Sequence, residues 1–98
     1  MRRVEFDPAA ESEVAEAAAY LEQQRRGYGD RFLAALRRAI ERIDEFPHIG
    51  RASRRHARTF TITEFKYDLV YRIDDELIFV FAVAHHARRP AYWRSRLR

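Results

Sequence analysis

The sequence contains no cysteine, which excludes disulfide bonds, thiolate catalysis and cysteine-ligated metal sites. No apolar run approaches the ~20 residues of a membrane-spanning helix, and the N-terminus lacks the apolar stretch of a signal peptide. With only three glycines and three prolines, the chain shows no linker, repeat or low-complexity segment. We therefore expect a single cytoplasmic domain over residues 1–98 that makes no contact with a membrane.

Lysine is nearly absent, because arginine supplies 18 of the 19 basic residues. Arginine favours planar, bidentate contacts with phosphate or carboxylate groups. The charges are also unevenly placed: the net charge is −2 over residues 1–50 and +6 over residues 51–98. A GC-rich genome also enriches arginine, so the asymmetry between the halves is the stronger signal. It indicates an anionic partner for the C-terminal half.

The N-terminal region predicts a short strand followed by a helix. Residues 2–6 have the length and alternation of a strand. Asp7 is a good N-cap, and Pro8 is preorganised for the first helical position. The apolar spacing then predicts a helix over residues 9–26, which Gly27 ends.

The tight connection Gly27-Tyr28-Gly29 predicts a second helix that folds back antiparallel to the first. We expect Asp30 to cap this second helix and Pro47 to end it. Its broad apolar stripe faces the core, and the small alanine side chains of the first helix allow the two helices to approach closely. The stripe consists of Phe32, Leu33, Leu36, Ala39, Ile40, Ile43 and Phe46.

The C-terminal half predicts strands. Residues 47–57 are expected to form an arginine-rich loop, and residues 59–63 a strand with Phe60 and Ile62 inward. Residues 65–73 alternate, which predicts a half-buried strand with one solvated face. The polar residues 74–76 fit a hairpin turn, and residues 77–84 are apolar on both faces, as in a central strand. The inward face of the alternating strand would carry Tyr67, Leu69, Tyr71 and Ile73.

The predicted order β-α-α-β-β-β gives an α+β fold: a small, mainly antiparallel sheet with a helical hairpin packed on one face. The opposite face would be left for basic residues. After Pro90 the chain is too short for a stable isolated helix, so we expect a docked turn carrying Tyr92 and Trp93. The sheet then ends in a cluster of His, Arg, Tyr and Trp residues, where we expect the function to lie.

Two kinds of catalytic site find no support in the sequence. The four histidines show neither an HExxH motif nor paired ligand spacing, so we expect no metal and no other cofactor. None of Ser12, Ser53 and Ser95 lies in a strand–turn–helix elbow that would activate a serine nucleophile.

Metal-free RNA cleavage and binding without catalysis both stay open. Cleavage needs a base, an acid and cations for the phosphorane charge, which histidine, tyrosine and arginine can supply. Binding to nucleic acid or to an acidic protein needs only arginines and aromatic rings. The plain structural alternative is a solvated arginine face beside packed rings. For the functional alternatives we predict that the loop after Pro47 and the strand end near residue 85 meet, with these target-contacting residues: Arg55, Arg58, His85, Arg88, Arg89, Tyr92 and Trp93.

An ordered set of short motifs resembles a known family. Pro-Ala-Ala opens the first helix, Gly-Tyr-Gly-Asp-Arg-Phe opens the second, and Phe-Pro-x-x-Gly follows it. A Phe-x-Tyr-x-Leu-Val-Tyr-Arg-Ile strand comes next, and the chain closes with His85-x-x-Arg88-x-Pro90-x-x-Trp93. This resembles the ParE branch of the RelE/ParE superfamily, the toxin half of bacterial type II toxin–antitoxin (plasmid stabilisation) modules. The resemblance covers nearly the whole chain.

The resemblance implies the same fold, a cognate antitoxin encoded alongside, and a target whose inhibition arrests growth. For ParE-type members that target is DNA gyrase; for RelE-type members it is mRNA on the ribosome. An antitoxin helix or strand would cover the helical hairpin and part of the sheet, giving a toxin–antitoxin hetero-oligomer. The antitoxin-contacting residues would include Val14, Leu21, Phe32 and Leu36.

Individual positions separate the two branches. RelE-type nucleases place an arginine just before Leu-Val-Tyr, whereas this chain has Asp68, which would repel phosphate. Tyr92 and Arg88 resemble a tyrosine and a basic residue of RelE-type enzymes, and Lys66 stands where ParE-like chains commonly have proline. The leading hypothesis is a non-enzymatic gyrase inhibitor. The alternatives are a ribosome-dependent mRNA endonuclease that uses His85, Arg88 and Tyr92, or an inactive toxin that acts only as a binding module.

Overall fold

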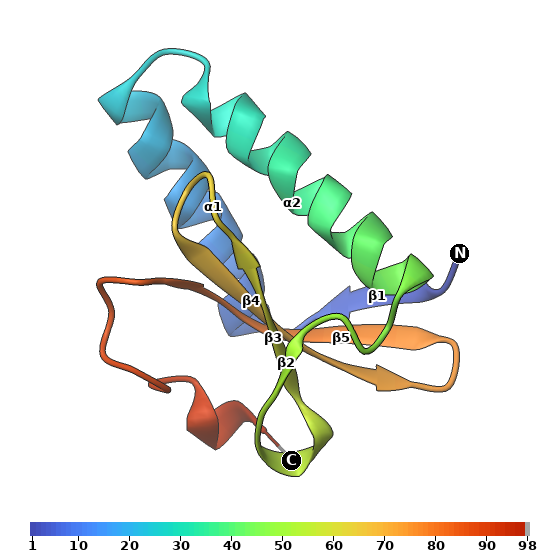
Figure 1. Ribbon diagram of the computed structural model, residues 1–98. Coiled ribbons are helices and arrows are strands. Elements are labelled where there is room, and N and C mark those ends of the chain that lie inside the picture. The colour runs from blue at the N-terminus through green and yellow to red at the C-terminus, as the bar shows by residue number, and fades with distance from the viewer. Residues whose placement is uncertain (98) are drawn as a thin grey trace.

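Two helices pack side by side on one face of a five-stranded sheet in the computed structural model, which describes residues 1–97 (Figure 1). This confirms the predicted α+β class. Neither long helix in this range combines the length and apolar character that crossing a bilayer requires. The elements in chain order are β1 (Arg3–Phe6), α1 (Pro8–Gln24), α2 (Tyr28–Glu45), β2 (Arg51–Ala52), a 3₁₀ turn (Arg54–His56), β3 (Arg58–Ile62), β4 (Tyr67–Asp74), β5 (Leu77–His85) and a second 3₁₀ turn (Arg94–Arg96).

The strands follow the order β1-β5-β4-β3-β2, with β1 parallel to β5 and every other pair antiparallel. The apolar strand β5 is an interior strand, as its sequence predicted, although β4 is the middle one. The loop predicted over residues 47–57 contains the two-residue strand β2, which pairs with Thr59 and Arg58. The observed order is therefore β-α-α-β-β-β-β, one short strand more than expected.

Helix α1 begins as the sequence predicted and ends slightly earlier. The Asp7 carboxylate caps it by accepting a hydrogen bond of 2.8 Å from the Ala9 N–H, and Pro8 takes the first position. The helix ends at Gln24, two residues before the predicted end. Beyond it, the Glu22 carboxylate accepts the N–H groups of Gly27 and Gly29, which would otherwise lack helical partners.

The prediction that Asp30 caps α2 is wrong, because the helix begins at Tyr28 and Asp30 lies inside its first turn. Its N-cap is Gly27 at φ 88°, a left-handed conformation that favours glycine. The close contact with α1 explains the early start. A Cβ atom on Gly29 would lie 2.8 Å from the Ala18 carbonyl oxygen, so only glycine lets the first turn of α2 form against α1.

The core between the helices and the sheet follows the predicted alternation. Tyr67, Leu69 and Tyr71 on β4 are buried toward the helices, and Ile73 packs against the same cluster. From β3, Ile62 is buried there as well, with Phe60 partly buried as predicted. The apolar stripe of α2 supplies Phe32, Leu36, Ala39, Ile40 and Ile43 to this core.

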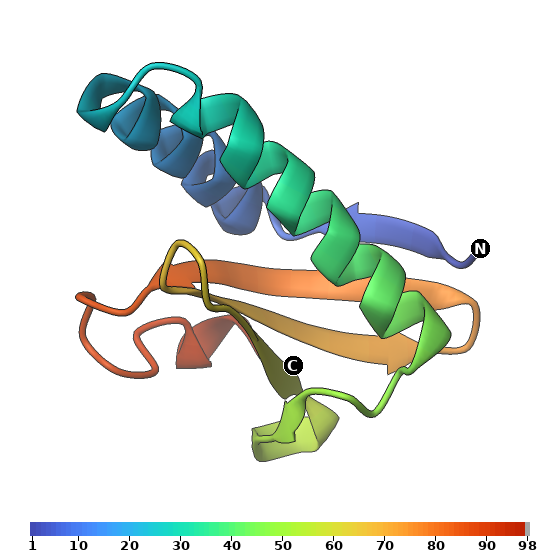
Figure 2. The ribbon, with the colours of Figure 1, turned by 45° about the horizontal axis from the view of Figure 1, so that its top comes forward.

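The opposite face of the sheet is not the solvated face that the alternation suggested. Val70 is fully buried there, in a second cluster with Ala57, Phe81, Ala82 and Leu97. Two consecutive β5 residues, Phe81 and Ala82, share this face because Phe81 is an extra residue in the ladder: Val70 pairs with Ala82 and Tyr71 with Val80. The C-terminal tail supplies the cover, as Figure 2 shows below the sheet.

The buried hydroxyl of Tyr71 ties the segment after α2 to the sheet. It accepts a hydrogen bond of 3.1 Å from the Gly50 N–H and donates one of 2.8 Å to the Pro47 carbonyl. Tyr71→Phe removes both bonds and leaves the buried Gly50 N–H unpaired. We expect the free energy of unfolding in urea to fall by about 1–3 kcal/mol. Tyr20→Phe, at a residue 54% exposed, is the control, and equal losses in the two variants would contradict the assigned role.

Candidate target-binding site

The outer edge of β5 is only half covered by another strand. Strand β1 pairs with β5 from Leu77 to Val80 and then turns into α1. The next edge groups, the Val83 N–H and the Phe81 carbonyl, are paired by side chains instead. The Glu13 carboxylate accepts the Val83 N–H at 3.0 Å, and the Arg96 guanidinium donates to the Phe81 carbonyl at 3.0 Å.

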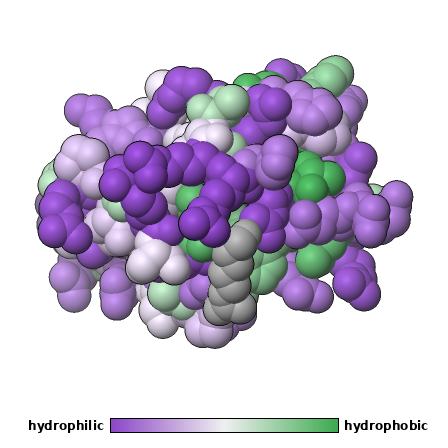
Figure 3. Space-filling view, turned by 90° about the horizontal axis from the view of Figure 1, so that it is seen from below, coloured by the Kyte–Doolittle hydropathy of each residue, from purple (hydrophilic) through white to green (hydrophobic). Residues whose placement is uncertain are grey.

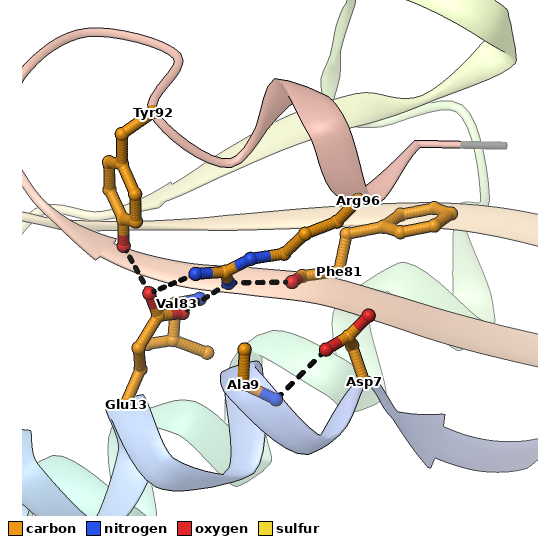
Figure 4. Close-up of polar contacts among 7 residues, drawn as sticks. All are labelled: Asp7, Ala9, Glu13, Phe81, Val83, Tyr92 and Arg96. Atoms are coloured by element: carbon orange, nitrogen blue, oxygen red, sulfur yellow. Dashed lines mark hydrogen bonds and ion pairs between the residues drawn. The ribbon is translucent and has the colours of Figure 1, made fainter.

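Glu13 also binds two residues of the C-terminal tail (Figure 4). Its two carboxylate oxygens lie 3.0 Å from Nη1 and Nη2 of Arg96, a bidentate pair, and the Tyr92 hydroxyl donates to the same carboxylate. Glu13 is only 8% exposed. One buried carboxylate thus holds α1, β5 and the tail together.

These contacts shift the ionisation of both partners. Burial alone would raise the pKa of the Glu13 carboxyl, but hydrogen bonds from Arg96, Tyr92 and the Val83 N–H outweigh it and hold the pKa below the ordinary 4.5. Burial, together with the hydrogen bond to the Glu13 carboxylate, raises the pKa of Tyr92 to about 12. At neutral pH the Tyr92 hydroxyl is therefore protonated and donates its hydrogen bond to Glu13.

The sequence interpretation missed this role of Glu13, together with that of Arg96. The position of Glu13 in the helical pattern could have indicated this role. Glu13 lies on the α1 face that carries the buried residues Ala10 and Ala17, three residues from one and four from the other. A carboxylate on an apolar stripe needs a buried partner.

The tail folds over the end of β5 and forms a hollow of about 330 Å³, which we call the tail basin. Five of the seven predicted target-contacting residues line it, and Arg51 and Asp68 join them. The lining consists of Arg51, Thr61, Asp68, Ala84, His85, His86, Arg88, Arg89, Pro90, Ala91, Tyr92 and Trp93.

The arginines of the tail basin carry uncompensated charge. Arg51, Arg88 and Arg89 are exposed, and none of them pairs with an acid anywhere in residues 1–97. The Arg88 guanidinium lies 4.0 Å from the centroid of the Tyr92 ring, and this cation–π contact holds it over the basin. Trp93 packs against the second core cluster and remains partly exposed. The basin can grip an anionic group.

The histidines of the tail basin are held by local contacts. The His85 ring packs edge-on against Tyr67 at 4.9 Å, and its Nδ1 accepts the Ala87 N–H at 3.0 Å. His86 Nε2 lies 2.9 Å from an Asp68 oxygen that also accepts the Thr61 hydroxyl at 2.8 Å. Asp68 therefore contacts His86 and Thr61 rather than the arginines of the basin.

The loop after Pro47 meets the tail only in part. Arg51 lines the tail basin and Ala57 packs with Leu97, but Arg55 and Arg58 line a separate cleft. The two are separated by the register of the sheet. Arg58 of β3 lies opposite Tyr71 of β4, whereas His85 of β5 lies opposite Tyr67, four residues away along β4. This cleft, which we call the loop cleft, has a volume of about 920 Å³. It is lined by Pro47, His48, Ala52, Ser53, Arg55, His56, Ala57, Arg58, Tyr71, Arg72, Ile73 and Asp74.

The four residues predicted to contact an antitoxin lie mainly inside the molecule. Phe32 is 0% and Leu36 6% exposed, and Val14 and Leu21 are half-buried against the same core. The helical hairpin instead offers a groove of about 540 Å³ between α2 and β3, which we call the α2–β3 groove. It is lined by Ala35, Arg38, Ala39, Glu41, Arg42, Glu45, Phe60, Thr61, Ile62, Thr63 and Glu64.

Metal ligation is not supported by the geometry. Within residues 1–97, no three side chains of His, Asp or Glu converge in a way that could hold a metal ion. The chemistry available at the tail basin is that of arginine, histidine, tyrosine and tryptophan.

Residues 4–90 match the model of a protein family described as the ParE toxin of the type II toxin–antitoxin system, parDE. The match includes both helices, the sheet except for Arg3, and the start of the tail. A search of curated protein sequences finds no match.

Solved structures share the fold at low sequence identity. A chain of the intact E. coli RelBE toxin–antitoxin complex superposes with a TM-score of 0.64 and 22% identity, covering 90% of this chain and 100% of its own. The isolated E. coli RelE toxin gives 0.64 and 21%, covering 97% and 95%. A chain of the chromosomal ParDE system from P. aeruginosa gives 0.61 and 11%, covering 87% and 96%.

Glu13→Gln tests the contacts that hold the tail. The variant leaves Arg96 without its counter-charge, so we expect the free energy of unfolding at pH 7 to fall by about 2–3 kcal/mol. This is less than for a fully buried pair, because the Arg96 side chain is 19% exposed. Limited trypsin digestion should also cut faster after Arg94 and Arg96. Glu16→Gln, at an exposed position of the same helix, is the control.

The same variant has a defined pH dependence. Because the folded pKa of Glu13 lies below 4.5, its stabilising effect is fully present above that pH and is lost as the pH falls through the folded pKa. The difference in unfolding free energy between the wild type and Glu13→Gln should therefore shrink below about pH 4.5. A difference that stays constant down to acid denaturation would contradict the role of the carboxylate.

Proposed function

Because this chain belongs to the ParE toxin family of type II toxin–antitoxin systems, we propose that it arrests bacterial growth by binding DNA gyrase through the tail basin and that a cognate antitoxin neutralises it. The observation that carries the proposal is the group of exposed arginines beside Tyr92 and Trp93, which pair with no acid within residues 1–97. Such a surface suits a tight contact with an anionic partner surface, because arginine and aromatic residues dominate binding energies at interfaces.

The contacts within the tail basin favour binding over proton transfer. A general acid or base works best with a pKa near the working pH, whereas the pKa of Tyr92 lies at about 12 and its hydroxyl is bound to Glu13. His85 Nδ1 is occupied by a backbone N–H. Asp68 adds a negative charge to the basin, which would oppose a phosphate there.

A ribosome-dependent mRNA endonuclease is the second candidate. It is favoured by the gathering of His85, Arg88 and Tyr92, the predicted nuclease set, in one hollow. An incoming RNA would have to displace the Tyr92 hydroxyl from Glu13 before that hydroxyl could take part in proton transfer.

We propose the α2–β3 groove as the antitoxin site. Its floor is apolar, with Ala35, Ala39, Phe60 and Ile62, and its rim carries charges of both signs. An amphipathic helix or an extended segment can place apolar side chains on such a floor and pair its own charges with the rim. The structural neighbours RelBE and ParDE are toxin–antitoxin complexes, which supports a partner of this kind.

Replacing the basin arginines tests the target contact. We expect Arg88→Gln/Arg89→Gln to need at least about tenfold more protein than the wild type for half-inhibition of gyrase supercoiling, equivalent to about 1.4 kcal/mol of binding. Arg26→Gln/Arg37→Gln removes two exposed charges of the helical hairpin that form no ion pair in the described part of the chain, and it should behave like the wild type. Growth after induction without the antitoxin gives the matching measurement in cells.

Normal supercoiling at high toxin excess would contradict gyrase as the target. Discrete mRNA cleavage sites seen by primer extension after induction would favour the endonuclease instead. Unimpaired growth at verified soluble expression would favour an inactive binding module.

Phe60→Ser tests the antitoxin site. It removes the largest apolar side chain from the floor of the α2–β3 groove, and we expect the affinity for the product of the neighbouring antitoxin gene to fall about tenfold or more in isothermal titration. Phe46→Ser, at a phenylalanine 50% exposed outside the groove, is the control and should bind normally. Equal losses in the two variants would count against the groove.

A further inference from the structure

The loop after Pro47 concentrates positive charge beyond the tail basin. Residues 51–58 contain four arginines and one histidine, with no acid among them. Arg51, Arg54, Arg55 and His56 are exposed, and no carboxylate within residues 1–97 pairs with them. This density of unpaired guanidinium groups sets up a strong local attraction for anions.

The loop holds these charges on a closed turn. The Ser53 N–H donates to the Ala57 carbonyl at 2.8 Å, and the Ala57 N–H donates to the Arg54 carbonyl at 2.9 Å. Within the turn, Arg55 and His56 both adopt positive φ, at 53° and 64°. Non-glycine residues seldom adopt this left-handed conformation, and the two hydrogen bonds that close the turn hold both residues in it.

The loop cleft beside this turn is also positively charged. Arg58 is anchored by donating to the His48 and Gly50 carbonyls at 3.3 and 2.8 Å, contacts that orient its guanidinium without neutralising it. The one acid in the lining, Asp74, lies 3.3 Å from Arg72 Nε. No acid in the described range 1–97 therefore forms an ion pair with Arg55 or Arg58.

The loop lies between two positive hollows. Arg51 lines the tail basin on one side, and Arg55 and Arg58 line the loop cleft on the other. Figures 1 and 2 both place the turn at residues 54–56 and the C-terminal turn at the lower end of the molecule. That end, seen from below, is dominated by hydrophilic side chains with only small hydrophobic groups between them (Figure 3).

We propose that residues 51–58 and the loop cleft bind the phosphodiester backbone of a nucleic acid. A single phosphate would need only one or two of these arginines. The four arginines of residues 51–58, which extend from the turn into the loop cleft, suit successive phosphates of one strand, and arginine is the side chain best matched to phosphate oxygens. Contacts from arginine to phosphate oxygens carry no sequence information, so we expect binding that is independent of sequence. It is a property of the toxin alone and does not depend on gyrase being the target.

The test is fluorescence anisotropy of the purified toxin with short, fluorescein-labelled duplex DNA and with single-stranded RNA of the same sequence, over a range of salt concentrations. Arg54→Gln/Arg55→Gln removes two exposed guanidinium groups that form no ion pair within residues 1–97, so we expect the fold to stay intact. We expect its plot of log affinity against log salt to be shallower by about 1.8 on duplex DNA, or ~0.9 for each lost phosphate contact. Comparing the two probes shows which nucleic acid is preferred.

Arg26→Gln/Arg37→Gln, with the same loss of charge on the helical hairpin, is the control and should keep the wild-type slope. Equal slopes in the two double variants would overturn the proposal, because net charge alone would then explain binding. Failure of the wild type to bind either probe at low salt would overturn it too. Displacement of the probes by ATP or inorganic phosphate at equal phosphate concentration would assign the cleft to a single phosphate and overturn the backbone contact.

Discussion

The buried carboxylate of Glu13 joins three parts of the chain that are far apart in sequence. It pairs with Arg96, accepts the Tyr92 hydroxyl and takes the Val83 N–H from the edge of β5. Because β1 is too short to cover that edge, the side chains of Glu13 and Arg96 form the hydrogen bonds to β5 that a longer strand would form. The position of the tail, and with it the shape of the tail basin, depends on this one charge pair.

Once the tail is fixed, it determines what the far face of the sheet can do. Trp93 and Leu97 cover Val70 and Phe81, so the face that would otherwise be solvated becomes a second small core. The arginines lie at the edges of this covered region. Those near the end of β5 gather in the tail basin, and those on the turn before β3 open onto the loop cleft. Two positive hollows replace the one continuous patch that the sequence suggested.

The chemistry of the tail basin follows from the same contacts. A tyrosine near the C-terminus of a metal-free nuclease would have to exchange protons, but here the Tyr92 hydroxyl is engaged by Glu13 and its ring supports Arg88. Of the side chains that resemble a nuclease set, Tyr92 thus contacts Arg88 through its ring and Glu13 through its hydroxyl. The chain shares its fold with E. coli RelE structures, although only about a fifth of the residues are identical. The choice between binding and catalysis therefore depends on individual side chains rather than on the fold.

The sequence by itself determined the class of the fold, because apolar periodicity and the residues that begin and end helices act over a few neighbours. The cap at Asp7, the buried faces of α2 and β4, and the apolar strand β5 all followed from such local patterns. It also determined the family, through the order of short motifs. Only the tertiary structure decided the start of α2 at a glycine pressed against α1, the extra residue Phe81, the burial of Val70 under the tail, and the pairing of Glu13 with Arg96. These features depend on contacts between residues up to 83 positions apart, where side-chain shape and the need to pair buried charge outweigh local preference.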